Sequence, residues 1–116
     1  MSRTLGEFEQ LVLFAIVKLG DGAYGAAIAT EIEQTVDRNV SSGALYTTLE
    51  RMENRELVCG TWGDPTIERG GRRRKYYLVE PAGAALLART FQALRSMGED
   101  LLPEVLAIAE RGGLDG

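Results

Sequence analysis

The sequence contains no histidine and only one cysteine, Cys59. The absence of histidine excludes Ser-His-Asp and Cys-His catalysis, the usual zinc sites and the ordinary neutral-pH proton shuttle. A lone cysteine cannot form an internal disulfide, and Cys59 is predicted to be a small buried residue of a strand. The acidic residues are spread along helix faces, without a glycine-rich phosphate loop or clustered metal ligands. We therefore expect no enzymatic activity, no cofactor and no metal site.

Long hydrophobic runs are also absent. The longest one covers only residues 11–17, whereas a membrane-spanning helix needs about twenty apolar residues. The start of the chain lacks the basic segment and the small-residue cleavage site of a secretory signal. We therefore expect a cytoplasmic protein without a membrane partner, built as one small domain of 116 residues.

Apolar periodicity and turn residues divide the chain into short elements. They predict three helices, two strands and a last helix, in that order, over residues 5–19, 24–36, 41–56, 57–62, 73–79 and 81–111. Thr4 and Glu7 have the spacing of a capping box at the first helix. Ser41 or Ser42 is expected to cap the third helix.

This order of elements predicts a mainly α fold with a small β-hairpin (α+β), namely a winged helix-turn-helix. Residues 1–80 would form the DNA-binding domain, and residues 81–116 a C-terminal dimerisation helix with a short tail. In such a fold the third helix enters the DNA major groove. The hairpin, or wing, lies along the phosphate backbone or the minor groove.

The sequence has 13 basic and 17 acidic residues, but five of the basic residues lie together within residues 69–75. Such a cluster repels itself unless an anionic partner neutralises it, and double-stranded DNA is such a partner. We expect wing contacts to DNA from Arg69, Arg72, Arg73, Arg74 and Lys75. Because side chains alternate along a strand, only one face of the wing should meet DNA, and the other should pair with acids of the domain.

The starts of the second and third predicted helices supply the other candidate DNA contacts. They are Tyr24, Ser42, Gly43, Tyr46, Thr47 and Arg51. Hydroxyl groups and free backbone N–H groups at helix starts bind phosphates, and the longer side chains reach base edges. Arg51 has glutamates nearby with which it could pair instead.

The last predicted helix carries an apolar heptad pattern. Its positions are Leu87, Phe91, Leu94, Gly98, Leu101, Val105 and Ile108. Gly98 and Pro103 are predicted to kink or break the helix between them. We expect the helix to form a homodimer with its counterpart, although folding back on the first helix remains an alternative. A small apolar effector could bind at this interface among Phe8, Phe14, Phe91 and Met97.

Several of these segments together resemble one family. Ser-Ser-Gly-Ala-Leu-Tyr at 41–46 and Leu-Glu-Arg-Met-Glu at 49–53 resemble the recognition helix of PadR-type transcriptional regulators. Tyr24-Gly25, the wing at 69–78 and Pro-Ala-Gly at 81–83 are also similar to that family. The resemblance implies a homodimeric repressor, of the compact branch with one short C-terminal helix, modulated by small ligands or other signals. Some compact relatives bind flat aromatic drugs between tryptophans of the dimer interface. The one tryptophan here, Trp62, lies in the first wing strand, so this mode does not transfer, and Trp62 is expected to support the sheet.

Two other functions remain open at this point. The first is a winged helix that binds an acidic protein through its basic hairpin and never contacts DNA. The second is a small-molecule sensor without direct DNA binding. The small polar residues at the start of the third helix favour DNA over an acidic protein.

Overall fold

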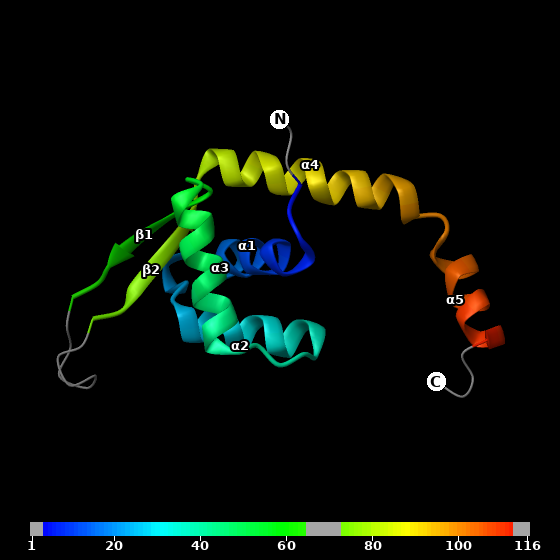
Figure 1. The fold of residues 1–116 in the computed structure, drawn as a ribbon, viewed down its shortest axis with the longest axis horizontal. Helices are drawn as coiled ribbons and strands as arrows, with labels where there is room; N and C mark the ends of the chain where they lie inside the picture. The colour runs from blue at the N-terminus through cyan, green and yellow to red at the C-terminus, as the bar shows by residue number, and fades with distance from the viewer. Residues whose placement is uncertain (1–3, 65–72, 113–116) are drawn as a thin grey trace.

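Five helices and a two-stranded hairpin make up the described part of the chain, residues 4–64 and 73–112 of the computed structural model (Figure 1). The elements are α1 (Glu7–Leu19), a 3-10 turn η1 (Gly20–Gly22), α2 (Gly25–Val36), α3 (Ser42–Asn54), β1 (Val58–Trp62), β2 (Lys75–Val79), α4 (Pro81–Gly98) and α5 (Leu102–Gly112). This is the predicted order, and the mainly helical fold with a β-hairpin is confirmed.

The first helix begins later than predicted. Gly6 is its N-cap, and the Gly6 N–H donates to Oε1 of Glu9 at 2.9 Å. The Thr4–Glu7 capping box was therefore wrong, because Leu5 is buried in extended backbone and the helix starts only after it. The helix ends at Gly20, whose φ of 60° suits a residue without a side chain, and its N–H bonds the Ile16 carbonyl.

The second and third helices bury the faces that their periodicity predicts. Ile28 and Ile32 of α2 are buried, as are Leu45, Leu49 and Met52 of α3. Ser41 caps α3, and its Oγ accepts the Ala44 N–H at 3.1 Å. Helix α3 ends at Asn54, before the predicted boundary at residue 56. These two helices pack on α1, with Val12, Leu13 and Ile16 at the centre of the core.

The hairpin is antiparallel, with Val58 paired to Val79 and Trp62 paired to Lys75. Its base is joined to the segment before α2, since the Tyr77 N–H donates to the Ala23 carbonyl at 2.9 Å. Arg73 and Arg74 precede β2, so this strand is shorter than predicted. The hairpin projects to one side of the three-helix body formed by α1, α2 and α3 (Figure 1).

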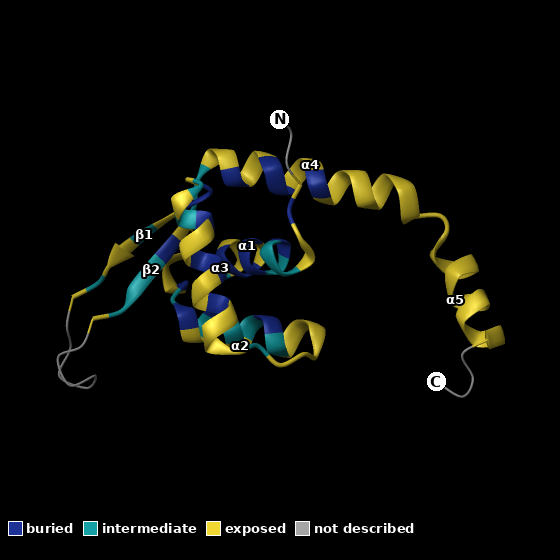
Figure 2. Cartoon of the chain, in the orientation of Figure 1, coloured by how far each residue is buried: buried dark blue, intermediate teal, exposed yellow. Residues whose placement is uncertain are grey.

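The C-terminal region consists of two helices. Pro81 is the first residue of α4, and the first half of the helix packs on the body through Leu86 and Leu87. Helix α4 ends at Gly98, and α5 begins at Leu102 after a turn of three residues. The predicted break is confirmed, and the single helix implied by the resemblance is corrected to two. The distal half of α4 and all of α5 are exposed (Figure 2), and the chain extends over 56 Å.

Candidate nucleic-acid interface

The start of α3 exposes a row of small and polar side chains on the face opposite the core. Ser42, Gly43, Tyr46 and Thr47 are exposed, whereas Thr48 points inward with the buried stripe of the helix. An exposed helix face of this size and polarity fits against the edges of bases in a major groove. Four of the five predicted candidates of α3 therefore lie on one accessible surface, and Arg51 is described below.

Tyr46 lies across the start of α2. A Cβ added to Gly25 would fall 2.8 Å from Cε1 of Tyr46 and closer still to its hydroxyl. Gly25 is buried and begins α2, with Tyr24 as its N-cap. The Tyr24-Gly25 pair thus has a physical reason, because only glycine leaves room for the Tyr46 ring between α2 and α3.

Arg74 is held by aromatic rings. Its guanidinium carbon lies 4.0 Å from the centroid of the Tyr24 ring, within the range of a cation–π contact. Tyr24 and Tyr76 meet edge to face with centroids 5.7 Å apart, and their backbones form an isolated antiparallel bridge. These contacts connect the wing to the start of α2 and fix the position of the Arg74 charge.

Arg73 lies beside Trp62 at the far end of the described hairpin. Its Nε donates to the Gly63 carbonyl at 2.9 Å, and its guanidinium carbon lies 5.9 Å from the Trp62 ring centroid. Trp62 is 54% exposed. The ring packs against Arg73 and Lys75 of the same wing, in keeping with the expected support of the sheet, and leaves about half of its surface open to solvent.

Lys75 is partly buried and paired with an acid. Its Nζ donates to Oε1 of Glu53 at 2.9 Å. This hydrogen bond raises the pKa of Lys75 above its ordinary value, and partial burial opposes the shift. Burial in turn raises the pKa of the neighbouring Tyr77. The wing therefore pairs Lys75 internally, whereas Arg73, which alternation predicts on the same face, bonds a backbone carbonyl and has no carboxylate partner among the described residues. Glu53 was not foreseen, since no local pattern relates positions 22 residues apart.

Aromatic and basic side chains together line an open groove of about 440 Å³ between the helix starts and the wing. The lining residues are Tyr24, Gly25, Tyr46, Trp62, Arg73, Arg74, Lys75 and Tyr77. Of the predicted DNA contacts, Tyr24, Tyr46 and three wing cations thus surround one groove. Arg69 and Arg72 lie outside the described residues.

Arg51 is directed toward the start of α1. Its Nε lies 3.7 Å from Oε2 of Glu9, and Arg55 lies 3.5 Å from the same oxygen. Arg51 nevertheless keeps a 55% exposed side chain. This geometry matches the expectation that Arg51 has a glutamate partner, and it reduces the freedom of the side chain to reach a base.

The residues predicted for the dimer interface divide into two groups. Leu87 is buried in the core of its own chain, so its placement in an intermolecular interface was wrong, and Phe8 packs partly buried against the same core. The other predicted positions are exposed, namely Phe14, Phe91, Leu94, Leu101, Val105 and Ile108. Phe14 and Phe91 meet edge to face with centroids 5.3 Å apart, which joins α1 to α4.

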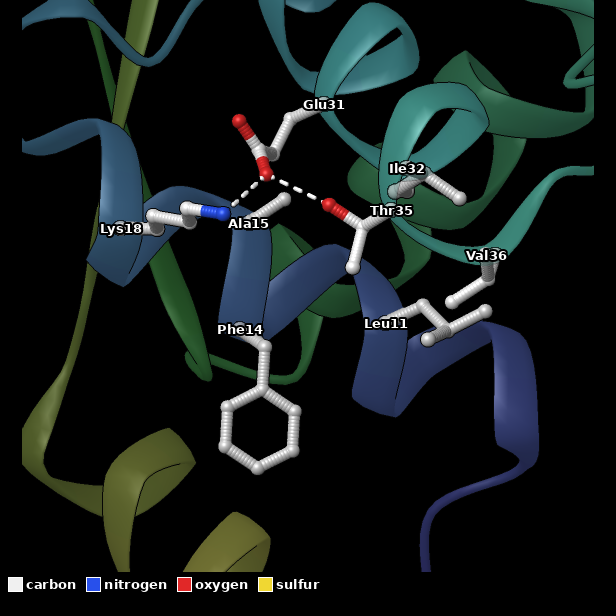
Figure 3. A pocket seen from close by; sticks show the side chains of 8 residues that line it. All are labelled: Leu11, Phe14, Ala15, Lys18, Glu31, Ile32, Thr35 and Val36. Carbon is white, nitrogen blue, oxygen red and sulfur yellow. Dashed lines mark hydrogen bonds and ion pairs between the residues drawn. The ribbon is translucent and has the colours of Figure 1, made fainter.

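Two apolar hollows adjoin Phe14. One of about 340 Å³ lies between α1, β2 and α4, where Val79, Leu87 and Phe91 line it. The other, between α1 and α2, measures about 80 Å³, and Lys18, Glu31 and Thr35 form its polar edge (Figure 3). The second is smaller than the usual ligand pocket of about 300–1,000 Å³. Neither Phe8 nor Met97 lines these hollows.

Within residues 4–64 and 73–112, no three acidic or cysteine side chains form a possible metal site. In the same residues, no helix has the length and hydropathy to cross a bilayer. Cys59 is exposed on the outer face of β1. Its predicted burial was wrong, because Val58 occupies the inward position of the strand.

Comparison with known proteins gives a consistent family. The family model described as "Transcriptional regulator PadR-like family" matches residues 13–89. A PadR-like transcriptional regulator from Bacillus cereus is 26% identical, with a TM-score of 0.68 and coverage of 85% of this chain and 90% of that chain. A PadR-like transcription factor from Bacteroides fragilis is 24% identical, with a TM-score of 0.65 and coverage of 81% and 85%. A PadR family regulator from Clostridium difficile is 24% identical, with a TM-score of 0.64 and coverage of 84% and 98%. No curated protein sequence matches significantly.

Proposed function

The chain belongs to the PadR-like family of transcriptional regulators, and we propose that it binds a two-fold operator in double-stranded DNA as a homodimeric repressor. Members of this family are transcription regulators and not enzymes. The observation that carries the proposal is the groove in which the exposed start of α3 meets the wing cations. The proposal places the protein in the cytoplasm, where such a regulator meets its operator.

The docking mode follows from the exposed side chains. The N-terminal end of α3 enters the major groove, with Ser42, Tyr46 and Thr47 toward phosphates and base edges. Arg73 and Arg74 lie along the phosphate backbone, and contacts from Arg69 and Arg72 stay a prediction from the sequence. Phosphate contacts of this kind supply most of the affinity, and the contacts of α3 supply the sequence preference.

Apolar surface on the C-terminal helices supports the homodimer. Phe91 and Leu94 are exposed on α4, as are Val105 and Ile108 on α5. Large apolar side chains exposed in this number favour an interaction site, and most soluble oligomers pair identical surfaces about a two-fold axis. The symmetry of the dimer then sets the symmetry of the operator.

A small apolar effector fits the same account. The hollow beside Phe14 and Phe91 lies along α4, next to the proposed dimer surface. A ligand that fills it would shift α4 relative to α1 and so change the separation of the two α3 helices. Such a ligand acts only through its different affinities for the two arrangements.

The test of DNA binding is the salt dependence of affinity for a labelled duplex. For each phosphate contact, the logarithm of the association constant should fall with the logarithm of salt concentration by about 0.9. The Arg73→Ala/Arg74→Ala variant should lose about 1.8 of this slope for each bound chain. The control Arg89→Ala/Arg95→Ala removes the same charge from exposed positions of α4 and should keep the parental slope. Equal slopes for both double variants would contradict the proposal.

A further inference from the structure

The ion pair between Lys75 and Glu53 joins the wing to α3. Lys75 is the first residue of β2, and Glu53 lies in the last turn of α3. Their side chains are 26% and 32% exposed, and Nζ of Lys75 stands 2.9 Å from Oε1 of Glu53. The bond therefore links the two elements that are proposed to contact DNA.

Gly60 of β1 leaves space for the Lys75 side chain, because it has no side chain of its own. A Cβ at position 60 would overlap Cε of Lys75 and would lie 3.1 Å from Oε2 of Glu53. Gly60 faces Tyr77 in the strand register, so the lysine stem crosses the hairpin diagonally to reach α3. The absence of a side chain at position 60 therefore allows Lys75 and Glu53 to form their ion pair.

Aromatic rings enclose the same ammonium group. Nζ of Lys75 lies 5.6 Å from the Trp62 ring centroid and 5.7 Å from the Tyr77 ring centroid. Tyr77 is itself part of the core. Rings and carboxylate together hold Lys75 in one place, since cation–π contacts and a charge-assisted hydrogen bond act on the same atom.

The two neighbouring arginines are held differently. Among the described residues, no carboxylate pairs with Arg73 or Arg74, which lie against Trp62 and Tyr24. A stacked guanidinium keeps its N–H edges available for phosphate oxygens. The charge of Lys75 is therefore paired with a carboxylate, whereas exposed Arg73 and half-buried Arg74 keep charges that none of the described carboxylates neutralises.

We propose that Glu53 is a positioning residue of the DNA interface, which withholds Lys75 from phosphates and pins the wing against α3. Glu53 thereby lowers the affinity for DNA of any sequence, because one cation of each wing does not bind a phosphate and so releases no counterion from DNA. The contacts of α3 then account for a larger share of the total binding free energy. This inference rests on the DNA binding proposed above.

The experiment measures affinity for a labelled duplex of arbitrary sequence over a range of salt concentrations. The variants are Glu53→Gln, Lys75→Met and the two combined. Glu56→Gln serves as a matched control, because it removes the same charge from an exposed position just after the end of α3. Circular dichroism and thermal melting check that each variant folds.

In Glu53→Gln, Lys75 no longer has a carboxylate partner and should contact a phosphate of the DNA. Glu53→Gln should therefore steepen the log–log slope by about 0.9 for each bound chain and tighten binding at low salt. Lys75→Met alone should leave the slope unchanged, and in the Glu53→Gln background it should remove the gain. Glu56→Gln should keep the parental slope. If Glu53→Gln fails to fold, the swapped pair Glu53→Lys/Lys75→Glu restores the bond and should also keep the parental slope.

Two results would overturn the inference while DNA binding stands. One is a parental slope in folded Glu53→Gln, and the other is a loss of about 0.9 in Lys75→Met alone, which would mean that Lys75 already contacts DNA. A changed slope in the swapped pair would also count against it. A parent chain that binds no duplex at any salt concentration would instead reject the proposed function, and the inference with it.

Discussion

The guanidinium carbon of Arg74 lies 4.0 Å from the centre of the Tyr24 ring. Tyr24 is the N-cap of α2 and Arg74 immediately precedes β2, so the contact connects the helix-turn-helix to the wing. The ring holds the cation without neutralising it, whereas a carboxylate would cancel its charge. The geometry therefore combines a fixed position with a charge that remains available to phosphate.

Replacing Arg74 by alanine should weaken binding to all duplexes to a similar extent. The expected loss is about tenfold at moderate salt, and the salt slope should fall by about 0.9 for each chain. Tyr24→Phe keeps the ring that holds Arg74 and should bind more tightly than Tyr24→Leu, which loses the cation–π contact. Fluorescence anisotropy with several duplexes checks this. A loss confined to one sequence would mean that Arg74 reads bases.

Gly83 should be irreplaceable in α4, because its α-carbon packs against the backbone of Leu57. A Cβ there would lie 3.0 Å from the Leu57 carbonyl carbon and closer to its oxygen. Gly83→Ala should lower the free energy of unfolding by about 1–3 kcal/mol. Gly98→Ala is the matched control, since a Cβ at that position would meet nothing within 4 Å, and it should raise stability by up to about 1 kcal/mol. Urea unfolding distinguishes them, and equal effects would refute the close contact.

Glu31 should make stability depend on pH in the acidic range. Lys18 and Thr35 donate hydrogen bonds to its carboxylate, at 2.6 and 2.7 Å, and lower its pKa below the ordinary 4.5. A lowered pKa in the folded state means that the ionised group stabilises the fold above pH 4.5, and that this contribution is lost as the pH falls through the folded-state value. Glu31→Gln should therefore be less stable than the parent at neutral pH, and the difference should shrink in acid. Urea unfolding at several pH values tests this, and a difference that does not change with pH would contradict it.

Leu94 should be essential for the dimer. It is 61% exposed on the distal half of α4. Leu94→Asp should convert a dimer into a monomer, because burying an unpaired carboxylate at an interface is unfavourable. Ser96→Asp adds the same charge at another exposed position of this helix and should leave the dimer intact. Light scattering gives the solution mass of each variant, and a dimeric Leu94→Asp variant would show that Leu94 lies outside the dimer interface.

Much of the helix-turn-helix could be predicted from the sequence, because its signals are local. The spacing of Leu45, Leu49 and Met52 fixes the buried face of α3, and the hydroxyl of Ser41 fixes its start. The cap of α1 could not be predicted, since Thr4 and Gly6 both precede a glutamate at the right spacing. Burial of Leu5 decides between them.

The errors at the wing and the C-terminal helix have a different cause. Alternation along β1 gives two faces but does not say which one the body of the domain covers, so Cys59 was predicted to be buried and is exposed. A heptad pattern likewise does not distinguish a partner subunit from the helix's own core. Leu87 meets its own core, while Leu94 on the same heptad pattern is exposed. Tertiary contacts determine the burial of the strand residues and of the heptad positions, and the spacing of apolar residues in the sequence does not reveal these contacts.

Selection of bound duplexes from a random pool shows whether two chains together read a symmetric site in DNA. We expect an enriched sequence with two-fold symmetry, whose half-sites lie about one helical turn apart, and a complex that contains two chains for each duplex. Selected duplexes without a shared sequence, or a complex with a single chain, would contradict this expectation.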